Sequence, residues 1–131
     1  MITGSCLCGS VRYEIRSVVG DPSHCHCSMC RKVHGAAFGT YARVPLSEFS
    51  WRSGEESVVT YHSSPGVRRT FCRRCGSTLQ YVTDTEPDSF ALALGTLDDD
   101  PGVRPTHHIF VLSKAPWYDI TDDLPQHDAD D

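Results

Sequence analysis

The sequence contains no long apolar segment. None of its hydrophobic runs approaches the roughly 18 to 20 residues that a membrane-spanning helix needs. The first six residues also lack the basic start and apolar stretch of a secretion signal. Internal repeats, low-complexity segments and linkers are absent from the 131 residues, a length typical of one domain. We therefore expect a single-domain cytoplasmic protein with no membrane partner.

Positive charge is also scarce. The chain has 12 lysines and arginines against 17 acidic residues, a formal net charge of −5. This balance argues against nucleic acid as a partner, because a surface that binds nucleic acid needs clustered positive charge. Acidic side chains crowd the end of the chain, and we interpret residues 121–131 as a solvated acidic tail that follows a domain spanning residues 1–120.

Helical periodicity is weak, and only short helical turns are expected, at residues 29–33 and 46–49. Strand patterns are more frequent. Val11, Tyr13 and Ile15 alternate with charged residues, which predicts a half-buried strand with these three side chains inward. Further strands are expected at residues 37–43, 58–61, 67–71, 77–81, 90–94 and 108–112. The pattern predicts a mainly β fold of folded antiparallel sheets.

Cysteine, by contrast, is abundant. Seven cysteines cannot all form disulfides within one chain, and without a secretion signal metal binding is the better interpretation. They fall into three tight clusters, whose short spacings direct the thiolates toward common points: Cys6-Leu7-Cys8, Cys25-His26-Cys27-Ser28-Met29-Cys30 and Cys72-Arg73-Arg74-Cys75.

Two of these clusters add up to a complete structural zinc site. A structural zinc takes four tetrahedral ligands, and two cysteine pairs from separate loops supply them. The four ligands are Cys6, Cys8, Cys72 and Cys75. Gly9 and Gly76 follow the pairs and permit tight turns whose backbone N–H groups point at the sulfur atoms.

The third cluster, Cys25, Cys27 and Cys30, supplies only three ligands. Three protein ligands and an open position are the arrangement of a catalytic zinc. Water, a substrate or a histidine could fill the fourth position, and the sequence leaves this open. The candidate histidines are His24, His26, His34, His107 and His108.

The clusters and their flanks resemble the glutathione-dependent formaldehyde-activating enzyme family, which also includes the centromere protein V domain. The similarity covers most of the chain, and the segments that carry it are Gly4-Ser5-Cys6-Leu7-Cys8-Gly9-Ser10-Val11, Cys25-His26-Cys27-Ser28-Met29-Cys30-Arg31, Phe71-Cys72-Arg73-Arg74-Cys75-Gly76-Ser77 and His108-Ile109-Phe110-Val111. The resemblance implies a β-tent fold, a structural zinc on Cys6, Cys8, Cys72 and Cys75, and a catalytic zinc on Cys25, Cys27 and Cys30. It also implies a carbon–sulfur lyase that joins glutathione to formaldehyde.

The ligand chemistry agrees with that activity. Three thiolates make zinc a centre that prefers sulfur to hydroxide, and a thiol that coordinates there loses its proton. The resulting thiolate is a nucleophile for an aldehyde carbon. The expected partners are thus a small thiol and an aldehyde, and Arg31 and Lys32 are candidates to contact the carboxylates of a glutathione-like thiol.

The histidines and aromatic residues are expected mainly in supporting roles. Neighbouring side chains along an extended chain alternate, so His26 is expected to point away from Cys25 and Cys27. His24 and His34 are expected on loop surfaces, and the His107-His108 pair is expected to pack or hydrogen-bond. Most aromatic side chains, including Trp117, are expected in the core, while Phe38 and Tyr41 are candidates to line a pocket.

Three other functional classes were weighed against this one. A zinc deaminase needs H-x-E and P-C-x-x-C motifs, and the sequence contains neither motif. A methionine-R-sulfoxide reductase needs a catalytic cysteine near the end of the chain, and no cysteine follows Cys75. The remaining alternative is a non-catalytic module in which both zinc ions are structural.

Overall fold

The computed structural model describes residues 1–17 and 20–130 and shows a mainly β protein. A three-stranded antiparallel sheet has the order β1-β2-β5, and a seven-stranded sheet has the order β10-β3-β4-β9-β8-β7-β6. The small sheet consists of β1 (Ile2–Ser5), β2 (Arg12–Ile15) and β5 (Phe49–Ser53). The large sheet consists of β3 (Gly20–Cys25), β4 (Gly39–Pro45), β6 (Val58–Ser64), β7 (Val67–Cys72), β8 (Thr78–Thr83), β9 (Ser89–Ala93) and β10 (His107–Ile109).

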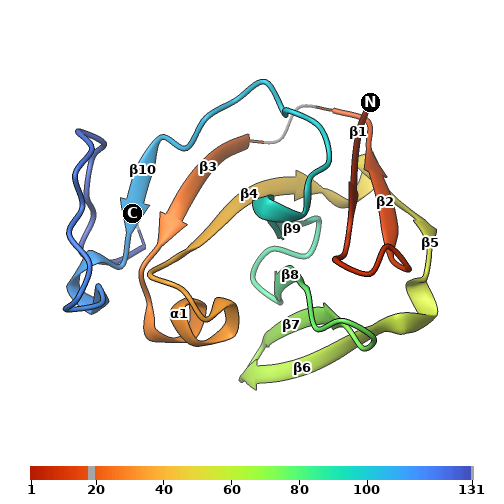
Figure 1. Ribbon diagram of the computed structural model, residues 1–131, viewed down its shortest axis with the longest axis horizontal. Coiled ribbons are helices and arrows are strands. Elements are labelled where there is room, and N and C mark those ends of the chain that lie inside the picture. The colour runs from red at the N-terminus through yellow and green to blue at the C-terminus, as the bar shows by residue number, and fades with distance from the viewer. Residues whose placement is uncertain (18–19, 131) are drawn as a thin grey trace.

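Helical structure among the described residues is confined to one short α-helix and four 3-10 turns. The helix is α1 (Ser28–His34), and the turns are Leu46–Glu48, Glu55–Ser57, Leu94–Thr96 and Val111–Ser113. In this part of the chain no helix is both long and apolar enough to cross a membrane. In Figure 1 the small sheet stands at one end of the molecule, β10 and the C-terminal segment stand at the other, and α1 lies beside the large sheet.

The main core cluster lies between the two sheets. As the alternation predicted, Val11, Tyr13 and Ile15 are buried, whereas Arg12 is exposed. Tyr13 packs on Phe49 and Trp51 of the small sheet, and the same cluster includes buried residues of β4 and β9 in the large sheet. Burial of these aromatic and branched side chains, each contributing about 1.5–3 kcal/mol, joins the two sheets.

Several predicted elements are confirmed with shifted bounds. The helical turns expected at residues 29–33 and 46–49 appear as α1 and the first 3-10 turn. The strand expected at residues 108–112 ends earlier, because Phe110 adopts a left-handed conformation with φ 56° that no strand continues through. The strands β1, β3 and β5 were not predicted from the sequence. Strands β1 and β5 are short, and β3 is polar with an internal proline, so none of the three shows a clear alternation.

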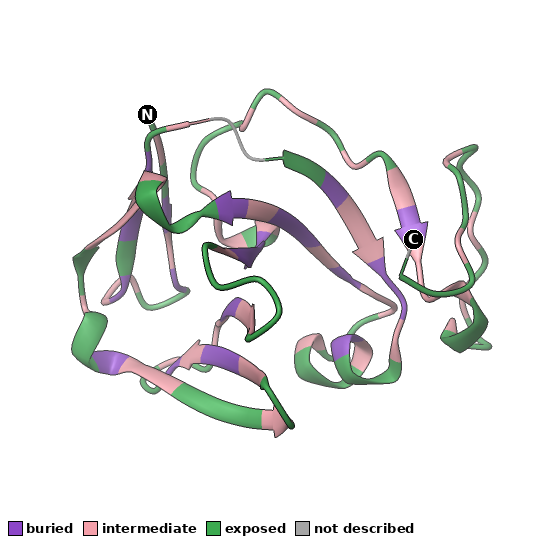
Figure 2. Cartoon of the chain, turned by 180° about the vertical axis from the view of Figure 1, so that it is seen from behind, coloured by how far each residue is buried: buried purple, intermediate pink, exposed green. Residues whose placement is uncertain are grey.

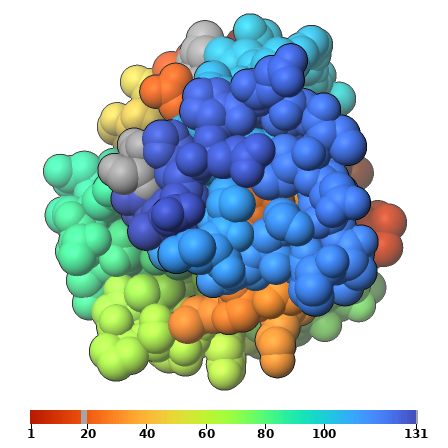
Figure 3. Space-filling view, turned by 90° about the vertical axis from the view of Figure 1, so that its left-hand side faces the viewer, coloured from red at the N-terminus to blue at the C-terminus, as the bar shows by residue number. Residues whose placement is uncertain are grey.

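The acidic end of the chain is not a free tail. Its residues are mostly exposed, as the colours of Figure 2 show, but its backbone is hydrogen-bonded to β10. His108 N–H donates to the Pro125 carbonyl at 2.9 Å, and His127 N–H donates to the His108 carbonyl at 2.9 Å. Figure 3 shows the C-terminal part of the chain covering this end of the molecule. The expected separation at residue 120 stays a prediction, but the structure gives the segment a fixed position.

Candidate metal centres and the adjoining cavity

The first cysteine group, here the four-cysteine site, brings together the two predicted pairs. The sulfur atoms of Cys6, Cys8, Cys72 and Cys75 all lie within 4.8 Å of one another. Cys6 Sγ is 3.6 Å from Cys8 Sγ, and Cys8 Sγ is 3.9 Å from Cys72 Sγ. Zinc–sulfur bonds of about 2.3 Å in a tetrahedron require sulfur separations of about 3.8 Å, so these residues fit a zinc ion.

The surroundings of the four-cysteine site stabilise thiolates. Gly9 and Gly76 have φ values of 79° and 81°, which bend the chain back toward the sulfur atoms after each pair. Val11 N–H donates to Cys6 Sγ at 3.3 Å, and Arg74 N–H donates to Cys72 Sγ at 3.4 Å. The predicted turns are therefore present, and each of these N–H donors lies two residues from a glycine.

Ser77 connects the two halves of this site. Its hydroxyl lies 3.2 Å from Cys75 Sγ and accepts the Leu7 N–H at 2.9 Å. The hydroxyl of Ser77 is the first cause that lowers the pKa of Cys75, to about 5. A ligand with a lowered pKa binds metal more readily at neutral pH, because less work is needed to deprotonate it.

The second group, here the three-cysteine site, forms where β3 passes into α1. Cys25 ends the strand, Cys27 caps the helix by accepting the Cys30 N–H at 3.3 Å, and Cys30 is in the first turn. Their sulfur atoms lie within 4.8 Å of one another, so this donor set also fits a soft metal ion. The Cys25 thiol lowers the pKa of Cys27 and the Cys27 thiol raises that of Cys25, because three adjacent sulfur atoms cannot all ionise without a cation.

No histidine or carboxylate of the described residues joins the three-cysteine site. As predicted, His26 points away: its Nε2 is 2.8 Å from Nδ1 of His108, and both side chains are fully buried. The expectation that His24 and His34 lie on loop surfaces was wrong. His24 belongs to β3 and packs against Phe38, while His34 ends α1 and is 2.8 Å from the Tyr41 hydroxyl.

Three hydrogen-bonded side chains, those of His26, His108 and Asp122, connect the segment that carries the three-cysteine site to the C-terminal segment. The His108 Nε2 atom is 3.0 Å from an Asp122 carboxylate oxygen, and its Nδ1 faces His26. Both hydrogen bonds form when His26 Nε2–H donates to His108 Nδ1 and His108 Nε2–H donates to Asp122. In this arrangement the His26 ring is neutral, with its one proton on Nε2. Burial is the main cause that lowers the pKa of His26, to about 4, in agreement with a neutral ring. The predicted hydrogen-bonding role of His108 is confirmed.

A cavity of about 480 Å³ opens beside the three-cysteine site. All three cysteines line it, together with side chains from β4, β7, β8 and the segment after β10. Tyr41 lines this cavity as expected, whereas Phe38 does not and packs against His24 and Tyr118 instead. Trp117, expected in the core, is 69% exposed.

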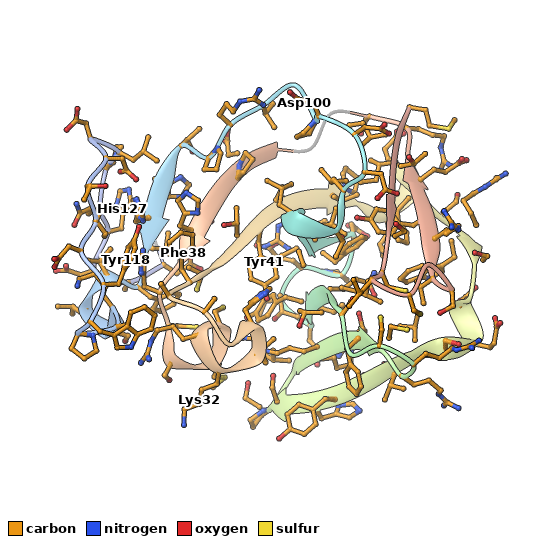
Figure 4. All side chains as sticks on the ribbon, viewed as in Figure 1. Lys32, Phe38, Tyr41, Asp100, Tyr118 and His127 are labelled. Carbon is orange, nitrogen blue, oxygen red and sulfur yellow. The ribbon has the colours of Figure 1, made fainter. Side chains whose placement is uncertain are left out.

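Neither Arg31 nor Lys32 lines the cavity, and Lys32 is exposed on α1, pointing away from the sheets in Figure 4. The charged side chain buried beside the cysteines is Arg69 of β7, which is only 4% exposed and which the sequence analysis missed. A signal for it existed: in the predicted strand at residues 67–71, Arg69 shares a face with Val67 and Phe71. A charge on an otherwise apolar face marks either an error in the strand or a functional residue.

Arg69 connects the cysteines to two tyrosines. Its Nη1 and Nη2 donate to Cys30 Sγ at 3.8 and 3.9 Å, and Nη1 donates to the Tyr41 hydroxyl at 3.4 Å. The guanidinium carbon lies 4.9 Å from the centre of the Tyr81 ring. Burial is the main cause that raises the pKa of Tyr41, so its hydroxyl keeps its proton. Because this hydroxyl accepts from Arg69, it can donate a hydrogen bond to His34 Nε2, 2.8 Å away, in the tautomer that leaves this nitrogen without a proton.

Comparisons with known proteins agree on one family. Residues 1–113, which include all seven cysteines, match the family described as "Glutathione-dependent formaldehyde-activating enzyme". A Halomonas elongata protein named "Putative glutathione-dependent formaldehyde-activating enzyme" is 32% identical over 131 residues, which cover 92% of this chain and 81% of that protein. An uncharacterized lyase of Schizosaccharomyces pombe is 31% identical over 81 residues, 60% of this chain and 56% of that protein.

A solved structure is similar as well. The crystal structure of a Rhodobacter sphaeroides protein aligns with a TM-score of 0.64 and 27% sequence identity, over 79% of this chain and 91% of that one. The shared fold therefore extends over most of both chains.

Proposed function

Because the chain belongs to the glutathione-dependent formaldehyde-activating enzyme family, we propose that it is a zinc-dependent carbon–sulfur lyase. The reaction is the reversible addition of a small thiol, glutathione or a similar one, to an aldehyde such as formaldehyde. One observation carries the proposal: three cysteines without a fourth ligand from the described residues line a cavity that also contains a buried cation.

Two zinc ions per chain are proposed. Cys6, Cys8, Cys72 and Cys75 would hold the structural ion, and Cys25, Cys27 and Cys30 would hold the catalytic one. When bound by three thiolates, zinc supplies an open coordination position at which a thiol is deprotonated near neutral pH.

The residues around the three-cysteine site would prepare the cavity for this chemistry. Arg69 places a positive charge beside Cys30 and so offsets the negative charge of a thiolate cluster. Tyr41 accepts from Arg69 and donates to His34, which fixes the orientation of all three side chains. Ile109, Phe110 and Ala91 contribute apolar surface to the cavity wall.

Arg31 and Lys32 keep a proposed role as contacts for the carboxylates of the thiol. They directly follow Cys30 on α1, but they reach a ligand only if its carboxylates extend out of the cavity. The Lys32→Ala variant tests this role: it should weaken glutathione binding by a small factor, about fivefold or less as expected for an exposed pair. Unchanged affinity would remove Lys32 from the site.

Cobalt substitution tests the main proposal. The protein is loaded with two Co²⁺ per chain, and glutathione is titrated while the thiolate-to-cobalt absorption is recorded. We expect a saturable change, because a thiol adds a fourth sulfur to the three-cysteine site. A glutathione analogue with serine in place of cysteine is the matched control and should produce no change.

The Cys27→Ser variant assigns the signal to a site. It should lose one metal and the glutathione response, while the metal at the four-cysteine site stays. Two metals and no response to any small thiol would contradict the enzyme proposal and favour a non-catalytic module in which both metals are structural.

The remaining partner and location assignments are also proposals. The net charge of −5 argues against nucleic acid. All seven cysteines are free, which suits the reducing conditions of the cytoplasm.

A further inference from the structure

Arg69 is buried without a counterion. Among residues 1–17 and 20–130, no carboxylate forms a salt bridge with it, and its side chain is 4% exposed. Its acceptors are the weakly accepting Cys30 sulfur and the Tyr41 hydroxyl, and one of its faces lies over the Tyr81 ring. A buried guanidinium requires more acceptors than these, because each N–H removed from water needs a partner.

The existing contacts leave one edge of the guanidinium without acceptors. Cys30 Sγ accepts from both terminal nitrogens and therefore occupies the end of the group. Tyr41 accepts from Nη1, on the side opposite Nε–H. The buried Nε has no hydrogen-bond partner, and Nη2 donates to no acceptor other than Cys30 among the residues that the structure describes. In the planar guanidinium these two N–H groups are parallel, so together they form a free fork for oxygen.

The free fork lies close to the position where chemistry is proposed. Given the fixed geometry of a guanidinium, an oxygen bonded to this edge lies about 7 Å from Cys30 Sγ. That span accommodates one sulfur atom and one carbonyl group between Cys30 and the fork. Arg69 also lines the 480 Å³ cavity, together with Cys25, Cys27 and Cys30.

We propose that Arg69 is a catalytic residue that binds the carbonyl oxygen of the aldehyde. This inference rests on the proposed function. Formaldehyde has a single polar atom, so a site can orient it only through its oxygen. The unpaired Nε–H of Arg69 is a charged donor beside the cysteines, in a cavity wall whose other donors, such as the hydroxyls of Ser28 and Tyr81, are neutral.

The role follows the charge that develops during addition. The thiolate sulfur forms a bond to the carbonyl carbon, the C=O π bond breaks, and its electron pair moves onto oxygen. The parallel N–H groups of Arg69 stabilise this oxyanion, which then takes up a proton from solvent to give the hemithioacetal. The thiol released one proton before attack, so the net reaction consumes none. Positioned donors act at the oxygen, where the charge increases most in the transition state.

The experiment compares Arg69→Met and Arg69→Lys with Arg68→Met. Arg68 is the neighbour on the same strand, pairs with Asp84 and does not line the cavity, which makes it a matched control. Metal content is measured for each protein, and thiol affinity is measured on the cobalt forms with glutathione and with 2-mercaptoethanol, which has no carboxylate. The rate of exchange between free thiol and hemithioacetal is then measured by NMR at saturating thiol with formaldehyde.

Arg69→Met is expected to bind both thiols as the wild type does but to form the hemithioacetal about 10²- to 10³-fold more slowly. Arg69→Lys should recover part of the rate, because it restores the charge without the fork. Arg68→Met should behave as the wild type. If Arg69→Met loses the metal of the three-cysteine site, the test uses Arg69→Lys instead. A reduced rate in Arg69→Lys with full metal content supports binding of the aldehyde oxygen by Arg69, and a wild-type rate overturns it.

Two results would overturn the inference while the proposed function stands. One is a wild-type rate in Arg69→Met. The other is an Arg69→Met protein that binds glutathione more weakly, binds 2-mercaptoethanol normally and keeps the wild-type rate at saturating thiol. That result would make Arg69 a contact for the carboxylates of glutathione. A wild-type protein that binds no thiol and accelerates nothing would instead overturn the proposed function and the inference with it.

Discussion

Replacing His108 by phenylalanine should destabilise the protein while keeping the volume of the buried ring. His108 is fully buried, hydrogen-bonds His26 and Asp122, and has ring centroids 4.9 and 5.0 Å from those of His24 and His26. Phenylalanine preserves most of this packing but accepts no hydrogen bond. The N–H of the buried His26 is then left without an acceptor, which costs about 1–3 kcal/mol.

His108→Ala adds the loss of packing to the loss of the hydrogen bond. Removal of a buried ring leaves a cavity, and large-to-small changes of this kind cost about 3–5 kcal/mol for aromatic residues. Because a domain of this size is stable by only about 5–15 kcal/mol, His108→Ala should fold marginally. The difference between the two variants measures the packing contribution separately from the polar one.

Stability is measured by urea unfolding in zinc-buffered solution with tryptophan fluorescence as the readout. Backbone hydrogen exchange of residues 122–129 is measured separately on the folded proteins. The backbone N–H of His127 should exchange faster in both variants, since the Asp122 link no longer anchors the segment. His62→Phe, on an exposed strand position, is the control and should change stability by less than about 0.5 kcal/mol. A His108→Phe protein as stable as the wild type would refute the reasoning that the His26–His108–Asp122 chain supports the fold.

Two further predictions concern the metal sites and the core. Cys72→Ser should prevent stable folding even with zinc present, because the four-cysteine site joins the start and middle of the chain. Cys27→Ser should fold and retain one zinc. Circular dichroism and metal analysis of the two variants distinguish these outcomes. If both variants fold equally well, the assignment of a structural ion is wrong. Gly4→Ala should destabilise the protein by about 1–3 kcal/mol, since the added methyl overlaps the Tyr13 ring, whereas Gly95→Ala, with no atom within 4 Å of its added methyl, should fold like the wild type in a thermal melt.

Local sequence patterns were sufficient for the parts of the fold that depend on near neighbours. The alternation of Val11, Tyr13 and Ile15 predicted a buried strand face, and it is buried. The short helix after Cys27 was also predicted, because its residues are adjacent in the chain and its cap lies within one turn. Strand β3 was not recognised, since it is mostly polar, contains a proline, and has buried residues, Pro22 and Cys25, that do not alternate with exposed ones.

The cysteine clusters could be recognised from the sequence for the same reason. Ligands separated by one or two residues must lie close together in any fold, so the spacing alone indicated metal sites, and the count of four and three indicated a closed and an open one. The union of the two distant pairs into the four-cysteine site needed ligand counting and family resemblance, because Cys72 lies 64 positions after Cys8.

What only the tertiary structure decided is which polar side chains meet. Parallel pairing of β10 with β3 brings His108 beside His26, 82 positions away in the chain, and the register of β7 in the large sheet places Arg69 against Cys30. No local spacing encodes such contacts, since they depend on strand order and on which face of each strand is covered. The sequence by itself thus determined the two cysteine clusters that could hold metal ions and much of the strand content, and the packed sheets determined the environment of those clusters.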